Sequence, residues 1–248
     1  MINKYSKIIK RSLFFAIIII CILFSYFVMV RYEVEGEKEM PFNIEKILIM
    51  STVTGMQDTH TENIWNLNIV QNNDLYLYIG KKNNSDDVLK KITIENFNIT
   101  KSPKKGNIKI YRPTGELSNL YTYSEQNYIN EKIEYTGSTI DDLKTLEVSN
   151  QGGIISIRIA TEEIGKYISD SDSEEIIHNS SLLTKSGITE EDINFTISFD
   201  MIIEIEKGIK YKGTIELNLP SENLIEKGSS NIEITNFDNV VFKRVKTN

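Results

Sequence analysis

Two stretches decide the fold class of this chain: NFTISFDMIIEIE at residues 194–206 and IKYKGTIELNL at residues 209–219. Both are rich in β-branched and aromatic residues that alternate with polar ones, which is typical of β-strands. Lys207-Gly208 between them has the chemistry of a tight turn. We therefore predict a β-hairpin here, and a chain that is mainly antiparallel β.

The same pattern recurs on both sides of this hairpin. Further strands are predicted at 44–53, 92–100, 108–111, 145–148, 154–159, 232–237 and 240–245. Residues 65–79 are interpreted as a second hairpin, with Asn72-Asn73 as its turn. Short strands broken by turn signals favour an antiparallel β-sandwich-like region over an α/β plan.

A short pattern, I-x-I-x-N-F, occurs at 92–97 and again at 232–237. It suggests two related β-units, a first at 43–130 and a second at 131–248. Coincidence in a chain rich in Ile and Asn is the alternative.

Two stretches depart from the strand pattern. Residues 139–146 suggest a short helix after a Ser/Thr cap, and residues 161–192 suggest a short helical insertion in which Thr161 and Ser173 cap the pieces. Such an excursion is either a lid over a site or a crossover between strands, and we favour the crossover.

Near the start, Ser12 to Val30 form 19 consecutive residues without a charge. As a helix this run is about 28 Å long, which matches one bilayer core. It ends in bulky residues, whereas a cleavable signal peptide ends in small ones. We therefore predict an uncleaved transmembrane helix at 12–30.

The charges around this run predict its orientation. Basic residues precede it, and acidic residues crowd the spacer at 31–42 that follows. By the positive-inside rule the tail at 1–11 lies in the cytoplasm and the bulk of the chain is extracytoplasmic, which makes this a single-pass protein of the cell membrane.

Composition excludes several functions. The net charge is −7, and the basic residues before Tyr32 make the rest of the chain more acidic still, so we expect no nucleic-acid partner. The only cysteine, Cys21, lies in the apolar run, which leaves the rest without a disulfide or a thiolate. No cofactor-binding motif is present, and no cofactor is expected.

Catalytic chemistry is weakly represented. The chain has two histidines, His60 and His178, and neither lies in a nucleophile motif. Asp58 and His60 could contribute to a metal site, but no third ligand is nearby in the sequence. A polar loop between strands is the favoured interpretation, and no catalytic residue is predicted.

An acidic run offers a second weak metal candidate. Asp170, Asp172 and Glu174 alternate as calcium ligands do, but the calcium-loop template requires Gly at the sixth position and Glu at the twelfth. The chain has Glu175 and Ser181 there. A solvated loop that caps a helix is the favoured interpretation.

Tyrosines are the remaining candidates for recognition, because aromatic faces stack on sugars or anchor a partner. Cross-strand aromatic pairs on a β-surface are the favoured alternative. The candidates are Tyr76, Tyr78, Tyr121, Tyr123, Tyr128 and Tyr135.

The stretch RYEVEGE at 31–37, followed by Met40-Pro41-Phe42, resembles the juxtamembrane part of uncharacterised single-pass membrane-anchored proteins of low-GC Gram-positive bacteria. The resemblance implies a cell-envelope location and brings no known activity. We therefore expect a non-enzymatic binding or assembly module whose partner is an envelope protein or a cell-wall component. The alternative is a membrane-anchored hydrolase or metal-dependent enzyme acting on the cell wall, with His60 or His178 in its site.

Overall fold

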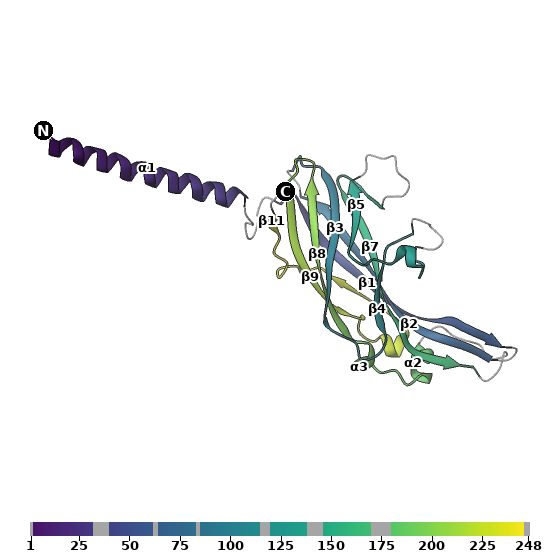
Figure 1. Ribbon diagram of the computed structural model, residues 1–248. Coiled ribbons are helices and arrows are strands. Elements are labelled where there is room, and N and C mark those ends of the chain that lie inside the picture. The colour runs from purple at the N-terminus through teal and green to yellow at the C-terminus, as the bar shows by residue number, and fades with distance from the viewer. Residues whose placement is uncertain are drawn as a thin grey trace.

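The computed structural model describes residues 2–31, 40–61, 64–82, 85–114, 120–137, 146–169 and 180–245. A long helix, α1 (Ile2–Arg31), leads away from a strand-rich body (Figure 1). Within the described residues, no helix is long and apolar enough to cross a membrane.

The body consists of two sheets. The five-stranded sheet has the order β10-β1-β2-β7-β4 and the six-stranded sheet the order β11-β9-β8-β3-β5-β6. Among the strands that the structure describes, all pairings are antiparallel except β5 with β6. The strands are β1 (Phe42–Thr61), β2 (Ile64–Lys81), β3 (Leu89–Lys101), β4 (Asn107–Tyr111), β5 (Lys132–Gly137), β6 (Leu146–Val148), β7 (Gly152–Ile168), β8 (Phe195–Ile205), β9 (Lys210–Leu219), β10 (Ser229–Ile234) and β11 (Lys243–Val245). The mainly β prediction is therefore confirmed.

The main core lies between the two sheets. On β2, alternate residues Leu75, Leu77 and Ile79 point inward and are buried, while Tyr76 and Tyr78 lie on the other face, as the period of two requires. The partner sheet contributes fully buried side chains as well. These are Ile92, Ile94, Ile197, Phe199, Met201 and Ile203.

The predicted units at 43–130 and 131–248 each contribute strands to both sheets. Their side chains also share the main core. The first copy of the motif lies in β3, and the second begins in β10, in the other sheet, and continues past its end at Ile234. Ile92 is fully buried, while Ile232 is 40 % exposed.

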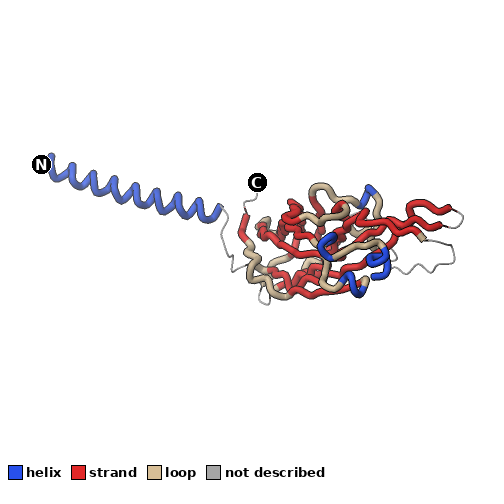
Figure 2. The backbone as a smooth tube through the Cα atoms, turned by 90° about the horizontal axis from the view of Figure 1, so that it is seen from below, coloured by secondary structure: helices blue, strands red, loops and turns tan. Residues whose placement is uncertain are grey.

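A second, smaller core lies at the end of the five-stranded sheet away from α1, where β1, β2 and β7 extend beyond the sandwich. We call it the far core. It joins strand residues such as Ile69 and Ile164 to Leu183, Ile193 and Leu224 of three short helices. These are α2 (Ser180–Lys185), α3 (Glu190–Ile193) and α4 (Leu224–Lys227), and Figure 2 shows short helices gathered in that half of the body.

Several predicted elements differ in the structure. The hairpin at 194–219 is confirmed by β8 and β9. The helix predicted to begin at Thr161 is wrong, because β7 continues to Ile168 with β2 as its neighbour. Helices are present later in that insertion, in α2 and α3, whereas the helix predicted at 139–146 falls almost wholly outside the described residues. The strands predicted at 232–237 and 240–245 do not pair with each other, since β10 pairs with β1 and β11 pairs with β9.

Candidate functional site

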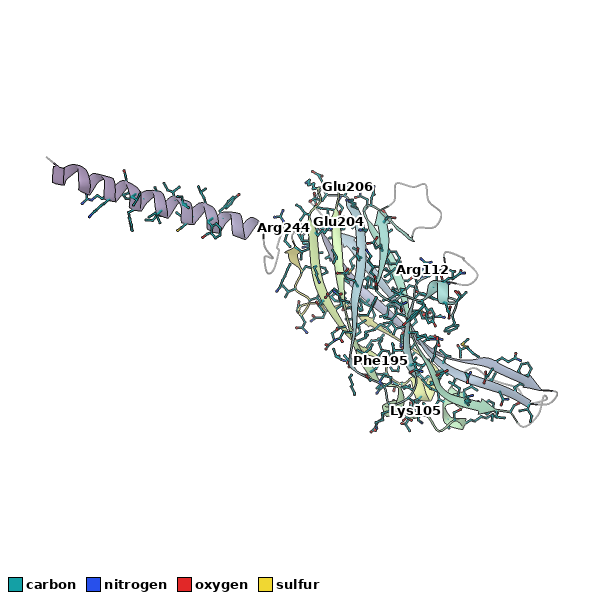
Figure 3. All side chains as sticks on the ribbon, in the orientation of Figure 1. Lys105, Arg112, Phe195, Glu204, Glu206 and Arg244 are labelled. Carbon is teal, nitrogen blue, oxygen red and sulfur yellow. The ribbon has the colours of Figure 1, made fainter. Side chains whose placement is uncertain are left out.

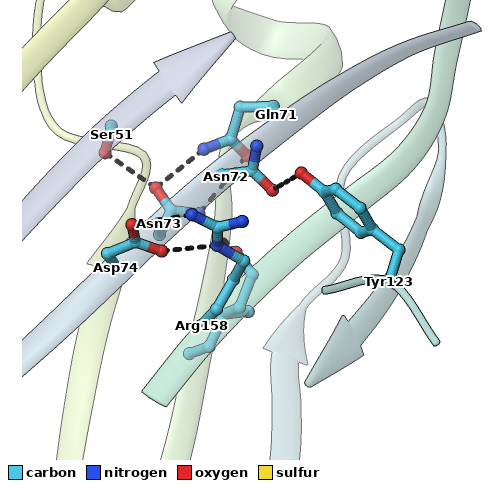
Figure 4. A network of polar contacts seen from close by, with 8 residues as sticks. Ser51, Gln71, Asn72, Asn73, Asp74, Tyr123 and Arg158 are labelled. Atoms are coloured by element: carbon cyan, nitrogen blue, oxygen red, sulfur yellow. Dashed lines mark hydrogen bonds and ion pairs between the residues drawn. The ribbon is translucent and has the colours of Figure 1, made fainter. Parts of the chain in front are cut away.

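A cluster of buried amides and hydroxyls interrupts the apolar inner face of the five-stranded sheet. Along β2, inward-facing Gln71 and Asn73 separate Ile69 of the far core from Leu75 of the main core, and both amides are 0 % exposed. Ser51, on the neighbouring β1, is directly opposite Asn73. We call Ser51, Gln71, Asn73 and Ser221 the buried amide network. Figure 4 labels Ser51, Gln71 and Asn73.

Asn73 is the centre of this network. Its Oδ1 accepts hydrogen bonds from Ser51 Oγ and from Gln71 Nε2, both at 2.7 Å. Its Nδ2 donates to the backbone carbonyl of Ile159 on β7 at 3.2 Å. The backbone N–H of Ser221 donates to Ser51 Oγ at 2.9 Å, which ties the loop after β9 to β1. Asn73 thereby joins three strands, and Ser51 joins the loop to them.

The turn predicted at Asn72-Asn73 is therefore wrong. β2 runs without a break from Ile64 to Lys81, with β1 on one side and β7 on the other. Two neighbouring strands pair with the backbone, and the Asn73 amide is bonded inside the protein, so the local preference of Asn for turns is overridden.

The outer face of the same strands carries an aromatic and charged cluster. We call Tyr111, Tyr121, Tyr123, Tyr128 and Arg158 the tyrosine–arginine face. Arg158 forms a bidentate ion pair with Asp74, its register partner across β7 and β2, at 2.6 and 2.9 Å. The Arg158 guanidinium lies 4.5 Å from the Tyr121 ring centre and 5.7 Å from that of Tyr123. Such stacking adds to the stabilisation that the ion pair provides.

A hydrogen bond joins this face to β2 next to the buried amide network. The Tyr123 hydroxyl donates to Asn72 Oδ1 at 2.8 Å, and Asn72 is the outward-facing residue between Gln71 and Asn73 (Figure 4). Tyr123 also meets Tyr111 edge to face, with ring centres 5.6 Å apart, and the Tyr111 hydroxyl donates to Glu162.

Burial and charge set the protonation states on this face. Burial raises the pKa of the Tyr121 and Tyr123 hydroxyls, so both stay neutral at physiological pH. Burial by itself lowers the pKa of Arg158, but the hydrogen bonds and charge of Asp74 outweigh it, and the net pKa is raised. Tyr111 and Tyr121 are buried, at 2 % and 8 % exposed, so the rings that this face presents to solvent are Tyr128 and, in part, Tyr123.

The six tyrosine candidates have different surroundings. Tyr121, Tyr123 and Tyr128 come together on the tyrosine–arginine face, where Tyr128 is 40 % exposed. Tyr135 does not join them, because it is buried in the main core and donates to the carbonyl of Ser156. Tyr76 and Tyr78 lie on the outer side of β2, as alternation predicted.

The weak metal candidates remain apart where they are described. Asp58 is exposed and forms an ion pair with Lys166 at 3.4 Å. His60 lies in β1 opposite Trp65, and its side chain is outside the described residues. Asp170, Asp172, Glu174 and His178 are also outside them. In the part of the chain that the structure describes, no three His, Cys, Asp or Glu residues gather as a metal site would require.

Sequence reasoning missed Arg158, Asp74, Tyr111 and the buried amide network. Arg158 and Asp74 are 84 residues apart, and only the register of β2 against β7 places them together. The available signal was the polar run Gln71-Asn72-Asn73-Asp74 inside an otherwise apolar alternation, which was interpreted as a turn.

A polar groove of about 510 Å³ opens where β8 and β9 meet α3 and α4. Ser221, one of its lining residues, belongs also to the buried amide network. Glu190 and Glu222 supply two carboxylates to the lining, and Lys101 supplies a cation. The groove has the size of a small-ligand site, but its lining is more polar than that of most such sites.

Comparison of the chain with protein-family models, with curated proteins and with solved structures gave no match.

Proposed function

We propose that this chain is a non-enzymatic binding or assembly module of the cell envelope. In this proposal residues 12–30 anchor it in the membrane, and the strand-rich body lies outside the cytoplasm. The tyrosine–arginine face carries the proposal, because its exposed Tyr128 ring packs against buried Tyr111 beside the desolvated Arg158, and tyrosine and arginine are enriched where surfaces hold a partner. The partner is an envelope protein or a cell-wall component.

Two observations support the anchor. The run from Ser12 to Val30 has no charge, and basic residues precede it while acidic ones follow. In the structure the large apolar side chains of α1 from Leu13 to Tyr26 lie on its surface, with Ile20 64 % and Phe24 67 % exposed. An exposed apolar surface of this kind requires a lipid or protein environment.

Thiol labelling in intact cells tests this placement. Asn231 is exposed on the edge strand β10, so Asn231→Cys should react with a membrane-impermeant maleimide before the cells are lysed. The wild-type chain, with Cys21 in α1 as its only thiol, is the matched control and should stay unlabelled. Labelling of Asn231→Cys only after lysis would contradict the extracytoplasmic placement.

Crosslinking from the native membrane tests the binding role. Tyr128→Ala removes an exposed ring from the tyrosine–arginine face and should reduce partner capture by full-length protein. Ile168→Ala, a 57 % exposed residue at the far end of β7, is the control and should leave capture unchanged. Equal capture by both variants would contradict a binding role for this face.

The polar groove favours one alternative, a membrane-anchored hydrolase or metal-dependent enzyme acting on cell-wall polymers. Paired carboxylates are the usual machinery of glycoside hydrolysis, and Glu190 and Glu222 both line the groove. Glu190→Gln and Glu222→Gln would then abolish function in cells, as would His60→Ala or His178→Ala if a histidine acts in the site. Full function in all four variants would leave the binding module as the sole candidate.

A further inference from the structure

An apolar groove of about 340 Å³ lies at the end of the body where β1 begins. Met40, just before β1, lines it together with Phe42 and Ile44 at the start of β1. From the segment between β10 and β11 it is lined by Phe237, Val241 and Phe242. Met40 and Phe42 are buried, whereas Val241 is 47 % exposed. The groove therefore joins the main core to the surface through apolar side chains.

This groove lies on the side of the body from which α1 comes. The helix ends at Arg31 and the groove begins at Met40, so the nine intervening steps of chain span at most about 30 Å. Figures 1 and 3 agree, because β11 and Arg244 lie at the end of the body nearest α1 while Lys105 lies at the opposite end.

We propose that this groove docks on the lipid surface of the membrane, with Val241 among the acyl chains; this rests on the proposed anchoring of α1. The short tether holds the groove close to the bilayer, where a weak apolar contact suffices because the effective concentration is high. Lys82, which also lines the groove, can bind anionic headgroups. Asp238, in the segment between β10 and β11, would repel them. Docking is therefore driven by apolar contact.

A bilayer fits this groove better than a protein partner does. Stable protein interfaces bury at least roughly 1,200 Å² and carry a ring of polar contacts. The lining here is mainly apolar, with Asn43 and Lys82 as its polar members. Interfacial lipid binding needs a few inserted apolar side chains on a tethered body, which is what the groove offers.

Tryptophan quenching in vesicles tests the docking. The full-length chain with Trp65→Phe and Val241→Trp is reconstituted into phosphatidylcholine vesicles with brominated acyl chains. We expect loss of most of its tryptophan emission compared with non-brominated vesicles. The wild-type chain is the control, since Trp65 near the start of β2 is separated from Lys82 by strand on the order of 50 Å long, and its emission should be unchanged.

The outcomes separate the docking from the anchor. Emission of the Val241→Trp chain that bromine leaves intact, while the chain still floats with the vesicles, would overturn the docking and leave the anchor standing. If aqueous acrylamide quenches the Val241→Trp emission and bromine does not, the groove faces solvent, and this result would also overturn the docking. Failure of both chains to float with vesicles would overturn the anchor, and the docking with it.

Discussion

Asn73 joins β2 to both of its neighbouring strands, through Ser51 on β1 and the carbonyl of Ile159 on β7. Asn73→Ala would leave the Ser51 hydroxyl and the Gln71 amide buried with fewer partners, which should lower the free energy of unfolding by about 2–4 kcal/mol. Asn231→Ala, on an exposed edge position, is the matched control and should change it by less than about 0.5 kcal/mol. Urea unfolding measures both; equal losses would contradict a structural role for the network.

The Arg158–Asp74 pair depends on the shape of the guanidinium as well as its charge. Arg158→Lys keeps the charge but removes the bidentate contact and the stacking on Tyr121, so we expect a loss of about 1.5–3 kcal/mol in unfolding free energy. Lys166→Ala breaks an exposed ion pair with Asp58 and should cost under about 1 kcal/mol. A fully stable Arg158→Lys variant would show that charge alone suffices.

At the scale of elements, the start of β7 depends on a glycine. Gly152 has φ +102°, and a Cβ there would lie 2.4 Å from the carbonyl oxygen of Ile79 on β2. Gly208, in the β8–β9 turn, also has positive φ but has open space around it. Gly208→Ala should cost about 1–2 kcal/mol from backbone strain alone. Gly152→Ala should lower the unfolding midpoint further, and equal midpoints would contradict the close approach.

The capping of α3 should depend on pH. The backbone N–H of Thr189 and the Lys105 ammonium bond to the Asp192 carboxylate and lower its pKa from 3.8 to about 2. A lowered folded-state pKa means that the stabilisation is complete above 3.8 and is lost as the pH falls through 2. The difference in unfolding midpoint between wild type and Asp192→Asn should therefore shrink between pH 4 and pH 2. A difference that does not vary with pH would contradict this.

Strand existence could be predicted from alternation, and strand ends could not. The hairpin of β8 and β9 was predicted because Lys207-Gly208 is both a local turn signal and a real turn. The pair Asn72-Asn73 gives the same local turn signal. It lies inside a strand nevertheless, because β1 and β7 both pair with that part of β2. Helical capping at Thr161 failed in the same way, because β2 and β4 pair with that part of β7.

The candidate site could be predicted only in part. Tyr121, Tyr123 and Tyr128 were singled out because aromatic residues are concentrated in a polar stretch. No local sequence pattern marks Arg158. Its contact with Asp74 depends on the register between two strands that are far apart in the sequence. The buried amide network was missed because hydrophobic patterning assigns Asn, Gln and Ser to the surface, whereas these residues are buried.

At the scale of the whole molecule, the main core and the far core meet at the polar boundary formed by the buried amide network, and we expect these two cores to differ in stability. Leu183→Ala removes a fully buried side chain from the far core and should increase hydrogen exchange mainly in α2 and the adjoining ends of β1, β2 and β7. Ile157→Ala, equally buried in the main core, should increase exchange throughout the body. Hydrogen-exchange mass spectrometry distinguishes these patterns, and identical patterns would contradict separate cores.

The long β1–β2 pairing gives the molecule a mechanical property. β1 starts at the end nearest α1 and pairs with β2 from Phe42 opposite Lys81 as far as Thr61 opposite Ile64, with β7 continuing the pairing on the other side of β2. Tension between a membrane anchor and a partner held on β7 would run along these strands, so their ladder bonds would be loaded in shear. Many bonds then resist together and must break together, whereas strands pulled apart from one end lose them one at a time. The arrangement is suited to carry force along its length without unfolding.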